Sequence, residues 1–256
     1  MNRCLLLVAA ISISVLADNA KTDNTNRPRG ALRKAGGMVS RTTEGGKVVF
    51  VNGSGLNAVS EIAANIQNSC GFPVSTLPME NSNGDALQVA LKTASGTNVS
   101  AAIVISASGV ETPSLIVCPE EGVATINVDS LFKNLPSEEA DMVKRNRLMA
   151  EMWRAVAFVL GGYDSGTLCA FSAITDSREI DNLPIKVFSP QILAKVVAGA
   201  ERRGVARIET TTYYDAVRRG WALAPTNEIQ KAIWDRVKAE KASATNATSK
   251  TSAPAK

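Results

Sequence analysis

Short, continuous apolar segments recur through the first half of the chain, and their length is what most restricts its fold. Lys47–Val51, Ala101–Ile105 and Val123–Val128 consist mainly of valine, isoleucine and alanine. Apolar runs of this length that are bounded by turn residues indicate buried strands. Two segments between them, Leu56–Ser69 and Asp85–Lys92, instead place their apolar residues at helical spacing. The chain therefore alternates strand and helix.

The order of these elements predicts the fold class. Pro73–Leu77 and Leu115–Cys118 add two short strands, and the turn-like Pro119–Gly122 joins the second of them to Val123–Val128. The resulting order, β-α-β-α-β-β-β, favours an α/β (α+β) fold. Its sheet is expected to be mixed, with one antiparallel strand late in the sequence.

The second half of the chain is expected to be helical. Its longest helix runs from Pro136 to Leu160 and stops at Gly161-Gly162. Residues 153–160 of this helix are apolar on all sides except at Arg154, which predicts a buried helix. Three further helices are expected, from Ser189-Pro190 to Gly204, from Thr211 or Thr212 to Gly220, and over Asn227–Lys238.

The two ends of the chain differ in composition from its middle. Arg3 precedes an apolar stretch, Cys4–Leu16, that ends in Val15-Leu16-Ala17, the pattern of a secretory signal peptide cut after Ala17. This stretch is shorter than the ~20 residues of a membrane span, so we expect a secreted or periplasmic protein without a transmembrane segment. The expected organisation is a signal peptide (1–17), a flexible lead-in (18–46), a single domain (47–239) and a disordered tail (240–256).

The net positive charge of the chain comes from its flanks. Residues 18–47 hold seven basic and three acidic groups, and residues 238–256 hold four lysines and one glutamate. The whole chain has a formal charge of +4, and Arg3 adds one positive charge, so residues 48–237 carry −4. A nucleic-acid-binding domain concentrates positive charge on its folded face, so we expect no nucleic-acid partner.

The absence of one residue type excludes several classes of enzyme. The chain has no histidine, which excludes the Ser-His-Asp triad, the Cys-His dyad and histidine-ligated zinc or iron.

Removal of the signal peptide leaves three cysteines, Cys70, Cys118 and Cys169. In an oxidising compartment they permit at most one disulfide, and the sequence leaves all three pairings open.

A glycine-rich turn follows the first strand. Gly53-Ser54-Gly55-Leu56-Asn57-Ala58 matches the G-x-G-x-x-A form of the dinucleotide fingerprint between a strand and a helix. Gly53, Ser54 and Gly55 are therefore the candidate cofactor-binding residues. The competing interpretation is a tight turn that needs small residues, and the export signal favours it, since nicotinamide cofactors are scarce outside the cytoplasm.

The end of the long helix carries a second pattern. Arg154 to Asp164 has the spacing of the extended metzincin motif H-E-x-x-H-x-x-G-x-x-[HD], in which two helical histidines and a third residue after a glycine bind zinc. Cys169-Ala170-Phe171 follows near the place of the C-x-M of archaemetzincins. Over residues 47–172 the chain thus resembles a degenerate archaemetzincin-like domain of the metzincin zinc metalloproteases. The resemblance implies a zincin-like sheet above the long helix.

The departures from that motif imply a loss of activity. The two helical ligand positions hold Arg154 and Phe158, and the position of the catalytic glutamate holds Ala155. Gly161 and Asp164 match the motif, whereas Phe171 replaces the turn methionine and Cys169 is displaced by one residue. The resemblance therefore implies no catalytic residue, no bound metal and no cofactor. It also implies that Arg154 and Asp164 form an ion pair in place of zinc, beside Phe158.

These observations predict an exported protein without catalytic activity, in effect a pseudoenzyme with a binding or structural role. Its partner would be a protein or peptide, bound near Val123–Val128, which the resemblance places at the exposed edge of the sheet, where an extended peptide can add a strand. Two alternatives remain open. One is an exported enzyme with a histidine-independent site, and the other is a nucleotide-binding module that uses Gly53–Ala58.

Overall fold

A computed structural model describes residues 35–80, 84–109, 113–135, 140–161, 177–182 and 190–250. The chain divides into two compact units, of which the larger comprises Ser40–Thr210 and the smaller comprises the segments before Ser40 and after Thr210. The sequence analysis expected one domain over 47–239. That single domain stays a prediction, and the last two helices pack with each other around a separate apolar cluster.

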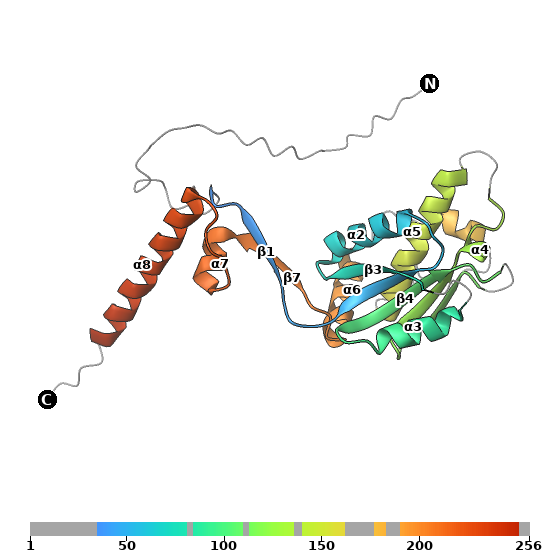
Figure 1. The fold of residues 1–256 in the computed structure, drawn as a ribbon, viewed down its shortest axis with the longest axis horizontal. Coiled ribbons are helices and arrows are strands. Elements are labelled where there is room, and N and C mark those ends of the chain that lie inside the picture. The colour runs from blue at the N-terminus through green and yellow to red at the C-terminus, as the bar shows by residue number, and fades with distance from the viewer. Residues whose placement is uncertain are drawn as a thin grey trace, which may run out of the picture. The chain divides into compact units, whose positions relative to one another are not determined.

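The larger unit is built on a five-stranded sheet with the strand order β3-β2-β4-β6-β5 (Figure 1). Four of these strands run parallel, and β5 pairs antiparallel with β6, so the predicted mixed α/β sheet with one late antiparallel strand is confirmed. The strands are β2 (Lys47–Asn52), β3 (Val74–Pro78), β4 (Val99–Ser106), β5 (Leu115–Cys118) and β6 (Val123–Asn127).

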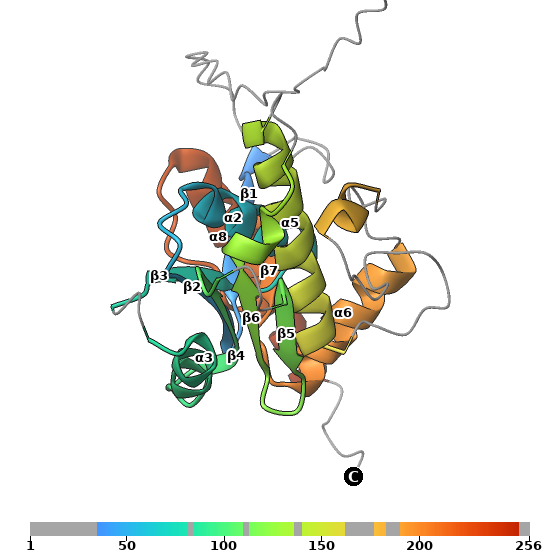
Figure 2. The same cartoon turned by 90° about the vertical axis from the view of Figure 1, so that its right-hand side faces the viewer.

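The alternation of side chains along the strands divides the core into two layers. On one face, Val48 and Phe50 of β2 join a large apolar cluster with α2 (Ala58–Cys70) and α5 (Ala140–Val159). On the other face, Val49 and Val51 pack against α3 (Ala86–Ala94). Figure 2 shows α3 on the opposite side of the sheet from α2 and α5.

Local signals set the ends of these helices as the sequence predicts. The side chain of Asp85 accepts hydrogen bonds from Leu87 N and Gln88 N at the start of α3. Gly71 ends α2 with φ of 68°, the left-handed conformation that glycine adopts most easily. The remaining helical elements of the larger unit are α4 (Val128–Leu131), η2 (Ser177–Asn182, a 3-10 helix) and α6 (Pro190–Arg202).

Two strands outside the main sheet were not predicted. Strands β1 (Met38–Thr42) and β7 (Ile208–Thr212) pair with each other in a separate two-stranded sheet. Their sequences, MVSRT and IETTT, are mostly polar, and neither strand has a fully buried residue. A ribbon that buries neither face leaves no apolar pattern in the sequence, which explains why the sequence did not reveal them.

The smaller unit contains α7 (Tyr213–Arg219) and α8 (Glu228–Lys250). Tyr213 and Val217 of α7 pack against Ile233 and Val237 of α8. Helix α8 continues to Lys250, into the segment that the sequence analysis expected to be disordered from residue 240. This extension is rich in alanine and lysine, which favour helix. In the part of the chain that the structure describes, no helix has the length and hydropathy that crossing a bilayer requires.

Candidate functional site

Three charged side chains and one aromatic side chain lie along the buried side of α5. Arg147, Glu151, Arg154 and Phe158 are spaced by four, three and four residues, which places them on one face of the helix. The residues around them are apolar and buried, and Arg147, Glu151 and Arg154 are themselves only 1%, 0% and 4% exposed. Charged side chains are rarely buried to this degree unless they are paired, so their partners define the chemistry of this face.

Glu151 and Arg154 form a buried ion pair one helical turn apart. Arg154 Nη1 donates to Glu151 Oε2, and the other carboxylate oxygen accepts a 2.6 Å hydrogen bond from Ser114 Oγ. The guanidinium carbon of Arg154 also lies 5.8 Å from the centre of the Phe158 ring, within the range of a cation–π contact. The pair thus links α5 to Ser114, the residue that precedes β5.

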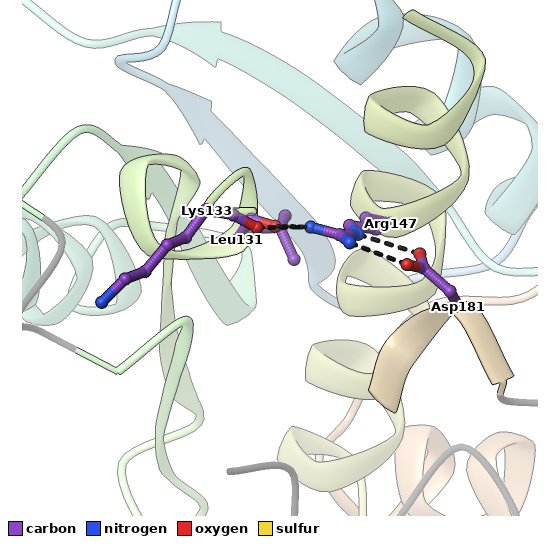
Figure 3. Close-up of polar contacts among 4 residues, drawn as sticks. All are labelled: Leu131, Lys133, Arg147 and Asp181. Carbon is purple, nitrogen blue, oxygen red and sulfur yellow. Dashed lines mark hydrogen bonds and ion pairs between the residues drawn. The ribbon is translucent and has the colours of Figure 1, made fainter. Parts of the chain in front are cut away.

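Arg147 joins three segments of the chain at the other end of this row of side chains (Figure 3). Its Nε and Nη2 donate to the two carboxylate oxygens of Asp181 on η2, at 2.8 and 2.7 Å. Its Nη1 donates to the carbonyl oxygens of Leu131 and Lys133, at 3.0 and 2.9 Å. The planar guanidinium therefore holds the end of α4 and the 3-10 helix η2 against α5.

The structure brings together some of the residues that the motif singled out. Arg154 is buried and pairs with Glu151, and Phe158 lies beside it. Ala155 is fully buried. Asp164, the predicted partner of Arg154, lies outside the described residues, as do Cys169 and Phe171. The predicted pair of Arg154 and Asp164 stays a prediction, and the ion pair that the structure shows is formed with Glu151.

The sequence analysis missed Arg147, Glu151 and Ser114. The spacing of Arg147, Glu151 and Arg154 was a readable signal, because it places three charges on one side of a helix whose second half is apolar. Ser114 and Asp181 carried no comparable signal, since both meet α5 only through the tertiary fold. They lie 37 and 34 residues from their partners in the sequence.

The donor set on α5 does not fit a zinc ion. The guanidinium of Arg154 is a cation without a free lone pair, and the side chains of Ala155 and Phe158 have no donor atom. Glu151 is 0% exposed and already bound to Arg154 and Ser114. Among the described residues, no three cysteine, aspartate or glutamate side chains lie close enough together to hold a metal ion.

The polar groups of the glycine-rich turn after β2 form hydrogen bonds with one another. The Asn52 carboxamide oxygen accepts from Ser54 N and Ser54 Oγ, and its nitrogen donates to Leu56 O. Gly53 N donates to Ile105 O of β4 at 2.7 Å, and a Cβ at Gly53 would meet the sulfur of Met79 at 2.5 Å. The small residues here serve close packing and a tight turn, and these bonds occupy two of the backbone amides that a phosphate would need.

The two described cysteines are both free thiols and are not bonded to each other. Burial raises the pKa of the Cys70 thiol to about 12, so this thiol stays protonated at neutral pH. Cys118 is half-buried at the end of β5. The pairing between Cys70 and Cys118 is therefore not formed.

The prediction that Val123–Val128 forms the exposed edge of the sheet is wrong. Its residues 123–127 form β6, which lies between β4 and β5 and is buried along its whole length. The edge strand is β5, where Ile116 is 36% exposed. The antiparallel hairpin places its first strand outside, and sequence pattern alone did not distinguish the inner strand from the outer one.

Three solved structures have backbone folds similar to that of this chain. An archaemetzincin from Methanopyrus kandleri has a TM-score of 0.47 at 13% identity and covers 62% of this chain and 97% of its own. A zinc-dependent peptidase from Methanocorpusculum labreanum has a TM-score of 0.45 at 15% identity and covers 59% of this chain and 100% of its own. An archaemetzincin from Archaeoglobus fulgidus, complexed with malonate, has a TM-score of 0.41 at 14% identity and covers 58% and 99%. No family model and no curated protein matches the sequence.

Proposed function

We propose that this is an exported, non-catalytic protein with a zincin-like α/β fold and a binding or structural role. The observation that carries the proposal is the buried pair of Glu151 and Arg154. In the metzincin motif, position 154 supplies a zinc ligand, and here it holds a cation that is neutralised within the helix. The chain has no histidine that could take over as ligand or base.

Two further observations on α5 argue against catalysis by its side chains. A zincin needs a general base next to its first ligand, and Ala155 offers none. The carboxylate of Glu151 is withdrawn from solvent and holds Arg154 and Ser114, so a substrate does not reach it in this arrangement. The nucleotide-binding alternative is disfavoured by the self-closed turn at Gly53–Gly55.

Metal analysis tests the non-catalytic proposal. We expect purified protein that has been incubated with zinc and desalted to hold well below one zinc ion per chain. We also expect its thermal midpoint to be unchanged by a chelator, because the fold of this region rests on ion pairs. Stoichiometric zinc, or metal-dependent cleavage of an unfolded protein substrate, would overturn the proposal.

Export is a separate part of the proposal and has its own test. The apolar stretch up to Leu16 and the small residue Ala17 favour cleavage after Ala17. We expect the protein purified from its native host to begin at Asp18, as determined by mass spectrometry of the intact chain. A mature protein that retains Met1 would contradict the signal-peptide assignment and would leave the zinc result unaffected.

A further inference from the structure

A hollow of about 350 Å³ lies where the end of α5, the end of α6 and the turn between β5 and β6 meet. Figure 2 shows these segments next to one another. Every residue that lines the hollow is described and belongs to the larger unit. The volume lies in the range of pockets that hold a small molecule, so the chemistry of the walls decides what the hollow can bind.

The inner wall of the hollow is built by a close approach of α6 to α5. A Cβ at Gly199 would collide with Leu160 O, so the two helices can meet here only because residue 199 is glycine. Val159 and Leu160 line the hollow beside Gly199, and both are buried. This wall is apolar apart from its main-chain groups, and its side chains are held by the core.

Two arginines at the end of α6 give the hollow positive charge. Arg203 Nη2 donates to Pro119 O in the turn, which uses one of the five N–H donors of this guanidinium. Arg202 is exposed, and its Nη2 lies over Gly161, where a Cβ would be 3.6 Å away. Within the described part of the chain, the Arg202 side chain has no hydrogen-bond or ion-pair partner. The hollow therefore offers two guanidinium groups to a carboxylate.

One acidic side chain lies at the same hollow. Glu120 follows Pro119 in the turn, is exposed and belongs to the lining. Its carboxylate has no hydrogen-bond or ion-pair partner among the described residues. The hollow thus combines two cations, one anion and an apolar wall. A ligand that matches these groups carries a carboxylate, an ammonium group and an apolar side chain.

We propose that this hollow binds a free α-amino acid with an apolar side chain. The carboxylate of the amino acid is bound by Arg202 and Arg203, and its ammonium group pairs with Glu120. Its side chain packs against the wall formed by Val159 and Leu160. The proposal goes beyond the proposed function and stands independently of export and of the loss of catalysis.

Isothermal titration calorimetry of the full mature chain with L-leucine tests the site. We expect one saturable site with a dissociation constant of about 1 mM or below, an affinity that a ligand of this size can reach. 4-Methylpentanoate, which lacks the ammonium group, and 3-methylbutylamine, which lacks the carboxylate, should each bind at least about tenfold more weakly. No binding of L-leucine at about 10 mM would overturn the proposal. Equally tight binding of 4-methylpentanoate would also overturn it, because the ammonium group would then play no part.

Two variants separate the two ends of the ligand. Arg202→Gln should weaken the binding of L-leucine and of 4-methylpentanoate alike, by about tenfold or more, whereas Glu120→Gln should weaken the binding of L-leucine only. The matched control is Arg207→Gln, which replaces an exposed arginine that pairs with Glu201 at 2.9 Å and does not line the hollow. The control should leave both affinities within about twofold of their original values. If Arg202→Gln behaved like this control, Arg202 would serve only to stabilise the end of the helix, and the proposal would fail.

Discussion

Replacing Arg147 with methionine should lower the free energy of unfolding by about 2–4 kcal/mol, one of the two largest effects expected here. Methionine fills much of the same space and removes every donor. The carbonyl oxygen of the buried Leu131 then loses this charged donor, which costs about 1–3 kcal/mol, whereas Lys133 is exposed and its carbonyl oxygen becomes hydrated at a lower cost. Asp181 contributes less, because more than a third of its side chain is exposed.

Urea denaturation of the purified variants measures this effect. The control is Arg145→Met, two residues away on the same helix, where the arginine pairs with Glu61 in an exposed position. This control should leave the unfolding midpoint close to that of the unmodified protein. If Arg147→Met and Arg145→Met shifted the midpoint equally, burial of Arg147 would have no energetic consequence, and the role assigned to its carbonyl contacts would be wrong.

The second large effect is expected at the pair of Glu151 and Arg154. Glu151→Gln preserves the shape of the side chain and removes the carboxylate that pairs with the buried Arg154, which should cost about 3–5 kcal/mol. Arg154→Met should have a similar cost, because it leaves the buried carboxylate of Glu151 with the neutral hydroxyl of Ser114 in place of a cation. Both values are read from the free energy of unfolding in urea.

The double variant distinguishes a coupled pair from two independent charges. Glu151→Gln combined with Arg154→Met should cost less than the sum of the two single variants, because the pair is removed whole and neither charge remains buried without the other. The control cycle uses Asp141 and Lys144, which have the same spacing on the same helix in an exposed position. Its coupling should be close to zero. Additive costs at 151 and 154 would contradict a coupled pair.

The elements of the main sheet were predictable because burial leaves a strong pattern. The strands β2, β4 and β6 are buried along most or all of their length, and their apolar runs in the sequence correspond to them closely. Gly220 was correctly predicted as a helix end, since it adopts the left-handed conformation there. The polar ribbon of β1 and β7 was missed, because its strands depend on pairing and not on burial.

The candidate site was predictable only in part. Arg154 stands out because a charge in an apolar helix requires compensation, and the structure supplies it one turn earlier, at Glu151. The exposed edge was assigned to the wrong strand, because β5 and β6 are both apolar and their order in the sheet is a tertiary property. Arg147 was overlooked because it lies in the charged half of α5, although its spacing from Glu151 and Arg154 places all three on one face of the helix.

The pairing of β1 with β7 has a consequence for the order of folding. Ser40 and Thr210, which share a hydrogen bond in this ribbon, are 170 residues apart in the chain. The five strands of the main sheet are all complete by Asn127. Closing a longer loop costs more conformational entropy, and contacts between distant residues form slowly. We therefore expect β1 to pair with β7 only after the main sheet has formed, so that a strand synthesised before the whole main sheet is among the last described elements to become ordered.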